Sequence, residues 1–128
     1  KIAPLKLAFG EYFDQLELVE ADMLKEETLF KAIEGSTYVV HTASPFPIAK
    51  PKNEDVLIKP AVEGTMAVMR AAHKNKVKRV VITSSVAAIY ISADKNKKDF
   101  TVADWTDLTL ATPYEKSKTM AEKAAWDF

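Results

Sequence analysis

The segment TPYEKSK, residues 112–118, places a tyrosine and a lysine four residues apart, at Tyr114 and Lys118. In a helix, side chains at positions i and i+4 lie on the same face, so the Lys118 ammonium would lie near the Tyr114 hydroxyl. A neighbouring cation favours the phenolate and lowers the pKa of a tyrosine, which makes it a usable proton donor near neutral pH. The pair alone is weak evidence of catalysis, because two polar residues on a solvated helix face share this spacing.

Two further features favour the catalytic interpretation. Residues 112–115, TPYE, have the form of a capping box with proline at the first helical position, which predicts that a helix begins here. Tyr114 would then lie in the first turn, at the mouth of that helix. Ser84 and Ser85 end a predicted strand, and a serine hydroxyl at that edge could donate to an oxygen that develops negative charge.

The elements that would position these residues alternate between strands and helices. The sequence predicts strands at residues 16–23, 37–42 and 77–90, and helices at residues 26–33, 55–75 and 112–126. Pro60 predicts either a kink in the long helix or a start at Lys59. Nearly continuous apolar character in the two later strands indicates a parallel sheet covered by helices on both faces. Ligands bind such sheets at the edge where the carboxyl ends of the strands meet.

Composition narrows the possible functions. The 128 residues suffice for one hydrophobic core, and the net charge of zero gives no global attraction to nucleic acid or anionic lipid. No apolar run reaches membrane-spanning length, and the chain has no cysteine. Its two histidines are far apart, and His41 is interpreted as a packed residue of a buried strand. We therefore expect a cytoplasmic protein that binds neither nucleic acid nor membrane and holds no metal.

Six segments of the chain together resemble the extended short-chain dehydrogenase/reductases. They are most similar to the group that contains dihydroflavonol reductase, anthocyanidin reductase and cinnamoyl-CoA reductase. The segments are LVEADM, VVHTASPFP, IKPAVEGTMAVMRAA, VKRVVITSSVAAI, DWTDL and YEKSKTMAEKAAWDF, which are spread over about residues 16–128 in the family's order. The resemblance implies an α/β fold with a Rossmann-type, doubly wound parallel sheet.

The resemblance also implies a role for each matching residue. Tyr114 matches the general acid that protonates the substrate oxygen as hydride arrives at carbon, and Lys118 matches the lysine that holds the nicotinamide ribose and tunes the tyrosine. Ser85 matches the catalytic serine, and Ser84 is the alternative, because the connection to Tyr114 varies in length in the family. Other residues match positions along the cofactor. Asp22 and Met23 would lie beside the adenine, Thr42, Ala43 and Ser44 in the strand-end turn, and Thr83 near the nicotinamide. Ser84, Tyr114 and Lys118 are also expected to bind the cofactor.

Parts of the family's pattern have no counterpart in this sequence. The G-x-x-G-x-x-G turn, which places a pyrophosphate at a helix N-terminus, has no match among Gly10, Gly35 and Gly64. The sequence also lacks the residues that distinguish NADP from NAD. The strands that follow the catalytic helix in the family are missing as well. We therefore expect residues 1–128 to be one incomplete NAD(P)-binding domain, a fragment that is inactive alone and exposes a strand edge.

The functional hypothesis concerns the longer protein. We expect an NADPH-dependent oxidoreductase that reduces a small-molecule aldehyde or ketone to an alcohol, although NAD is possible because the preference for NADP comes from the family alone. A nucleotide-sugar epimerase or hydroxysteroid dehydrogenase of the same fold is an alternative, and so is a non-catalytic dinucleotide-sensing or scaffold protein. The resemblance leaves open a homodimer formed through the two long helices.

Overall fold

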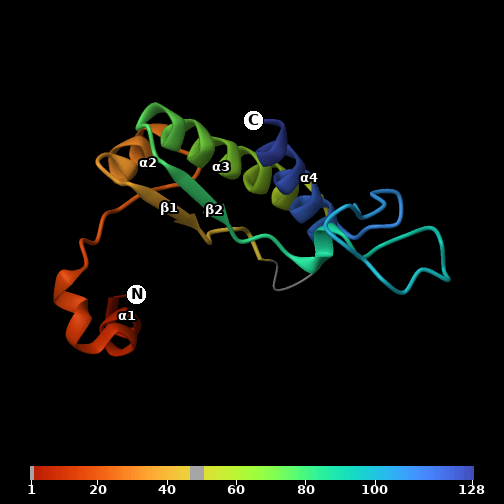
Figure 1. Cartoon of the computed structure of the whole chain (residues 1–128), viewed down its shortest axis with the longest axis horizontal. Coiled ribbons are helices and arrows are strands. Elements are labelled where there is room, and N and C mark those ends of the chain that lie inside the picture. Colours follow the sequence, from red (N-terminus) through yellow and green to blue (C-terminus); the bar gives the residue numbers. More distant parts are fainter. Residues whose placement is uncertain (1, 47–50) are drawn as a thin grey trace.

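The computed structural model describes residues 2–46 and 51–128 (Figure 1). The helices are α1 (Ile2–Phe9), α2 (Glu26–Ile33), α3 (Asp55–Lys74) and α4 (Pro113–Asp127), and two short 3₁₀ helices are η1 (Gly10–Gln15) and η2 (Val86–Ala88). The strands are β1 (Tyr38–His41) and β2 (Arg79–Ile82). Among the described residues, no helix combines the length and the apolar character that crossing a bilayer requires.

The two strands form a parallel pair, in which Tyr38 lies opposite Arg79 and His41 lies opposite Ile82. A parallel pair needs a long crossover, and α3 supplies it, so β1, α3 and β2 form the predicted βαβ unit. α3 and α4 run side by side over one face of the sheet (Figure 1). On the other face, the side chains of Tyr38, Val40 and Val81 are more than half exposed. The described residues thus cover one face of the sheet rather than the two that the sequence predicts.

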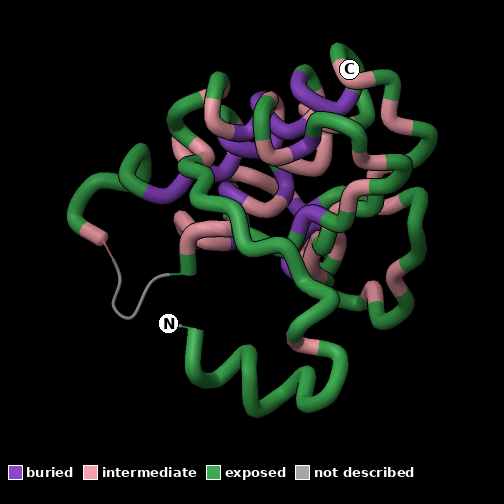
Figure 2. The backbone as a smooth tube through the Cα atoms, turned by 90° about the vertical axis from the view of Figure 1, so that its left-hand side faces the viewer, coloured by how far each residue is buried: buried purple, intermediate pink, exposed green. Residues whose placement is uncertain are grey.

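One cluster of the core lies where α2 and α3 pack together and against β1. Its buried members are apolar residues at helical spacing on the facing sides of the two helices: Leu29, Ile33, Ala67, Val68 and Ala71. Buried residues gather in the region where the helices pack, whereas the N-terminal segment is exposed along most of its length (Figure 2). In the described part of the chain, α1 and η1 contribute no buried residue. The N-terminal segment therefore does not contribute to the core.

The predicted strand at residues 16–23 is wrong. Residues 16–22 form neither helix nor strand, and the side chains of Leu18 and Val19 are about half exposed, at 49% and 52%. A strand requires a hydrogen-bonding neighbour, and none of the described residues pairs with this segment. The segment ends in a turn, in which the Leu24 amide donates to Asp22 Oδ1 at 3.0 Å, and this turn leads into α2.

The other predicted helices and strands form, most of them with shifted ends, whereas α1 and η1 were not predicted. The strand expected at residues 77–90 is limited to Arg79–Ile82, because the chain turns after Thr83 and enters η2. α3 begins at Asp55 and runs through Pro60, so a start at Lys59 is wrong. Pro60 cannot donate a hydrogen bond to the Val56 carbonyl, but the helix continues past it.

Candidate functional site

The carboxyl ends of β1 and β2 lie side by side and face α4. The Thr83 amide donates to the His41 carbonyl at 2.9 Å, which keeps the two strands together beyond the last residue of β2. A small pocket at this edge, the strand-end pocket, brings together several of the predicted site residues, namely Ala43, Ser44, Thr83, Ser84 and Lys118. It lies at the edge where the sequence predicts a ligand site.

α4 presents the tyrosine and the lysine as the spacing predicts. The capping box forms at its start, where the Thr112 amide donates to Glu115 Oε2 at 2.6 Å, so Tyr114 lies in the first turn. The Lys118 ammonium lies 5.9 Å from the centre of the Tyr114 ring. Both side chains are half-buried, and burial lowers the pKa of Lys118. A cation therefore lies beside the phenol ring at the mouth of the helix.

A buried carboxylate next to Tyr114 anchors this first turn. Besides the Thr112 amide, Glu115 accepts a hydrogen bond from the hydroxyl of Tyr90, which lies in the connection after η2. Burial opposes ionisation of Glu115, but the hydrogen bonds from Tyr90 and Thr112 outweigh it and lower its pKa. The bond to Glu115 raises the pKa of Tyr90. Sequence reasoning did not identify Tyr90, because no local pattern links residues so far apart in the chain.

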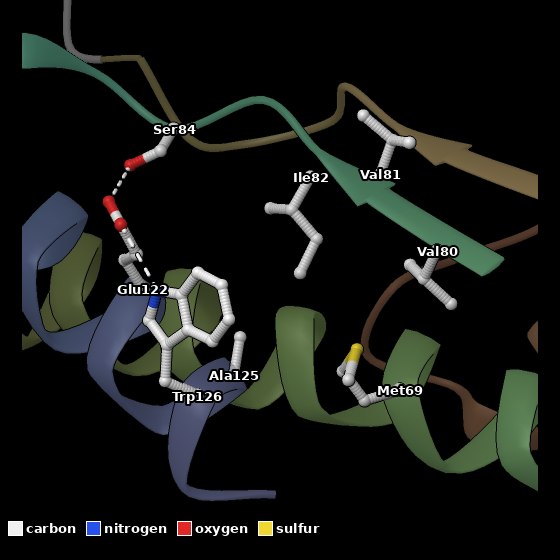
Figure 3. A pocket seen from close by; sticks show the side chains of 8 residues that line it. All are labelled: Met69, Val80, Val81, Ile82, Ser84, Glu122, Ala125 and Trp126. Atoms are coloured by element: carbon white, nitrogen blue, oxygen red, sulfur yellow. Dashed lines mark hydrogen bonds between the residues drawn. The ribbon is translucent and has the colours of Figure 1, made fainter. Parts of the chain in front are cut away.

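The two serines after β2 make different hydrogen bonds. The Ser84 hydroxyl donates to the carboxylate of Glu122 on α4 (Figure 3). Ser85 Oγ instead accepts from the Ala87 amide at 3.1 Å and caps η2. Ser84 lines the strand-end pocket, whereas Ser85 and Tyr114 are not among its described lining residues. The assignment of the catalytic serine stays a prediction.

The remaining predicted cofactor residues lie around this edge or farther along the chain. Thr42 follows β1 and is exposed. Asp22 lies in the turn before α2, where its amide donates to Thr28 Oγ1 at 2.9 Å. Met23 packs on α3, and a Cβ at Gly64 would lie 3.2 Å from the Met23 Cβ. Asp22 and Met23 are not among the described residues that line the strand-end pocket.

Two aromatic side chains adjoin the site without having been predicted as site residues. The Phe46 ring meets the Tyr114 ring edge to face, with 5.4 Å between ring centres. The only sequence signal for Phe46 was its place in the SPFP segment. His41 lines the strand-end pocket and is buried, as the sequence interpretation expected. Burial and, to a lesser extent, the charge of Lys118 lower the His41 pKa, so its imidazole is neutral at neutral pH.

The donor set of the strand-end pocket fits a ribose better than a metal ion. The hydroxyls of Ser44 and Thr83 and the ammonium of Lys118 could hydrogen-bond to sugar hydroxyls. Within the described ranges, no group of three or more histidine, aspartate or glutamate side chains could hold a metal ion.

Comparison with known proteins identifies the family. Residues 7–127 match the sequence model of the 3-beta hydroxysteroid dehydrogenase/isomerase family. The chain belongs to this family. This result confirms the resemblance to the extended short-chain dehydrogenase/reductases that the six segments indicated.

Curated relatives include two plant reductases. Tetraketide alpha-pyrone reductase 1 of Arabidopsis thaliana is 41% identical over 123 residues, a match that covers 90% of this chain and 37% of the relative. An anthocyanidin reductase of Vitis vinifera is 44% identical over 126 residues, covering 88% of this chain and 36% of the relative. The chain thus spans little more than a third of the length of the curated relatives it matches.

A solved structure confirms the fold. The yeast methylglyoxal/isovaleraldehyde reductase Gre2, solved in complex with NADPH, superimposes with a TM-score of 0.76 at 32% identity. The match covers 98% of this chain and 41% of Gre2. The chain is therefore part of a Rossmann-type α/β fold, as the sequence predicted.

Proposed function

We propose that this chain is the central part of an NADPH-dependent reductase that converts an aldehyde or ketone to an alcohol by hydride transfer. The observation that carries the proposal is the Lys118 ammonium 5.9 Å from the centre of the Tyr114 ring, beside two paired strand ends. The comparisons support it, because the relatives include enzymes named as reductases and Gre2 is solved with NADPH.

Tyr114 is the proposed proton donor. Its hydroxyl gives a proton to the carbonyl oxygen of the substrate as the carbonyl carbon is reduced, and the product is the alcohol. The Lys118 ammonium lies beside the Tyr114 ring and would interact with Tyr114 during this transfer. Ser85 hydrogen-bonds the substrate oxygen while negative charge develops on it.

The strand-end pocket is the proposed site for the nicotinamide half of the cofactor. Lys118, Ser44 and Thr83 line this pocket and would hold the ribose hydroxyls. When bound, NADPH supplies the hydride. Asp22 and Met23 would lie on the adenine side, and Thr42 and Ala43 along the turn between the two halves. We propose that a glycine-rich turn for the pyrophosphate is supplied by a part of the longer protein outside these residues.

Hydroxysteroid oxidation is a second candidate, favoured by the description of the matching family model. It uses the same proton-transfer residues in the opposite direction, with Tyr114 as base. Steady-state assays of the longer protein with aldehydes and NADPH, and with hydroxysteroids and NADP, separate the two. Turnover of the carbonyl compounds alone supports the reductase.

Replacement of the tyrosine tests the proposal itself. In the longer protein, Tyr114→Phe should abolish turnover and leave NADPH binding, measured by cofactor fluorescence, close to that of the parent. Tyr12→Phe is the matched control, because Tyr12 is 60% exposed on η1 and should not affect turnover. A Tyr114→Phe protein with full activity would show that the chain serves another function, such as sensing the dinucleotide.

A further inference from the structure

Glu122 shares the catalytic face of α4 with the two proposed catalytic residues. It follows Lys118 by one helical turn and Tyr114 by two, and its side chain lines the strand-end pocket together with that of Lys118. Both oxygens of its carboxylate are occupied (Figure 3). The Ser84 hydroxyl donates to Oε2, and the Trp126 indole nitrogen donates to Oε1 at 3.3 Å.

Three consecutive residues after β2 are each held by a different part of the fold. Thr83 is bound through its amide to β1, Ser84 through its hydroxyl to Glu122 on α4, and Ser85 through its Oγ to η2. The middle bond joins the strand end directly to the helix that carries Tyr114 and Lys118. It therefore limits how far the serines can move relative to the proposed proton donor.

The direction of the hydrogen bonds distinguishes the two serines. A hydroxyl has one hydrogen to donate, and Ser84 gives its hydrogen to a carboxylate, the stronger, charge-assisted kind of bond. Ser85 acts as an acceptor from the Ala87 amide, so its own hydrogen can be donated elsewhere. A group that stabilises a developing oxyanion must donate a hydrogen bond, and Ser85 meets this requirement while Ser84 is engaged.

We propose that Glu122 is a positioning residue that engages the Ser84 hydroxyl, ties the end of β2 to α4, and thereby makes Ser85 the serine that donates to the substrate oxygen. The proposal rests on the reductase function proposed above. Without the carboxylate, the Ser84 hydroxyl could rotate freely and the end of β2 would lose its bond to the catalytic helix. Both changes disturb the alignment of Ser85 with Tyr114.

Kinetics of the longer reductase test the role of Glu122. A displacement of about 1 Å at the reacting groups can cost roughly 100-fold in rate, so Glu122→Ala should lower kcat about 10-fold to 100-fold. The KM for NADPH should change less than kcat, because both oxygens of the Glu122 carboxylate are already engaged by Ser84 and Trp126. Glu122→Gln keeps a carbonyl oxygen that can accept from Ser84, and it should recover most of the lost kcat.

A matched control lies on the same helix. Lys116 forms an ion pair with Glu54, with 2.8 Å between Nζ and Oε2, so Lys116→Ala also removes a long-range contact of α4. This variant should keep the kcat of the parent. If Glu122→Ala has the same kcat as Lys116→Ala while Tyr114→Phe is inactive, the positioning role is wrong and the reductase function still holds. Activity retained by Tyr114→Phe would instead contradict the reductase function.

The two serines give an independent test that leaves Glu122 in place. Ser85→Ala should lower kcat by about 100-fold to 1,000-fold, as the loss of one oxyanion donor does. Ser84→Ala removes the same hydrogen bond as Glu122→Ala and should therefore cost about 10-fold to 100-fold. A larger loss for Ser84→Ala than for Ser85→Ala would overturn the proposal. If circular dichroism shows that Glu122→Ala does not fold, the kcat values of Ser84→Ala and Ser85→Ala decide which serine donates to the substrate oxygen.

Discussion

The Tyr90 hydroxyl donates a hydrogen bond to the buried carboxylate of Glu115, which joins the connection after η2 to the first turn of α4. Glu115 directly follows Tyr114 in the chain, so this bond also determines where the proposed proton donor lies. The capping box holds the same carboxylate from within the helix. The position of Tyr114 therefore depends on one local contact and one contact between distant parts of the chain.

Removal of the Tyr90 hydroxyl should destabilise the protein. Tyr90→Phe leaves the Glu115 carboxylate with one donor fewer in a buried place, and we expect a loss of about 1 kcal/mol in the free energy of unfolding. Urea unfolding of the longer protein measures it. Tyr12→Phe, with its exposed hydroxyl, should unfold at the same urea concentration as the parent. An unchanged midpoint for Tyr90→Phe would show that this bond contributes nothing to stability.

The same pair predicts a dependence of stability on pH. The folded-state pKa of Glu115 is lowered from 4.5. The ionised carboxylate therefore contributes fully to stability above the ordinary glutamate pKa, and this contribution is lost as the pH falls through the folded-state pKa. The folded-state pKa of Tyr90 is raised from 10.0. The protonated hydroxyl therefore contributes fully to stability below pH 10.0, and this contribution is lost as the pH rises through the folded-state pKa.

Unfolding measured from acid to alkaline pH checks both limits. The stability difference between the parent and Tyr90→Phe should be largest between the two ordinary pKa values and should shrink toward either extreme. A difference that stays constant across the whole range would contradict the ionic character of the bond, because an uncharged hydrogen bond does not titrate.

The 128 residues alone should show no turnover of aldehydes with NADPH. The chain spans 37% of a curated relative, and none of its three glycines matches the glycine-rich pyrophosphate turn. Without a positioned nicotinamide, Tyr114 and Lys118 lose the orientation that supplies much of the rate enhancement. A spectrophotometric assay at 340 nm checks this expectation. Preparing the Tyr114→Phe chain in parallel detects a contaminating enzyme, because activity present in both samples cannot come from this site.

The open face of the sheet should cause the isolated chain to self-associate. Val40 and Val81 lie opposite each other in the parallel pair and are 67% and 52% exposed. Replacing both with threonine keeps the β-branched shape that strands favour and makes this face polar, so association in sedimentation velocity should fall. Replacing Val102, which is 98% exposed outside the sheet, with threonine serves as the control and should leave association unchanged.

Local sequence patterns were sufficient to predict the helix that carries the candidate site. The capping box at residues 112–115 and the four-residue spacing of Tyr114 and Lys118 both depend on contacts within one or two helical turns. The βαβ unit of β1, α3 and β2 was predictable for a similar reason, because apolar periodicity and the length of the crossover are properties of short segments. Residues 16–23 had the pattern of a strand, but a strand also requires a neighbour, which no short segment specifies.

Contacts between distant residues could not be predicted in this way. Ser84 and Glu122 are 38 residues apart, and Tyr90 and Glu115 are 25 residues apart, yet their hydrogen bonds distinguish the two serines and anchor the first turn of α4. Such bonds depend on how α4 packs against α3 and η2, which is set by the combined shape of many side chains. The residue types and their spacing therefore established the candidate proton-transfer pair, whereas the packing of α4 against α3 and η2 established which groups hold that pair in place.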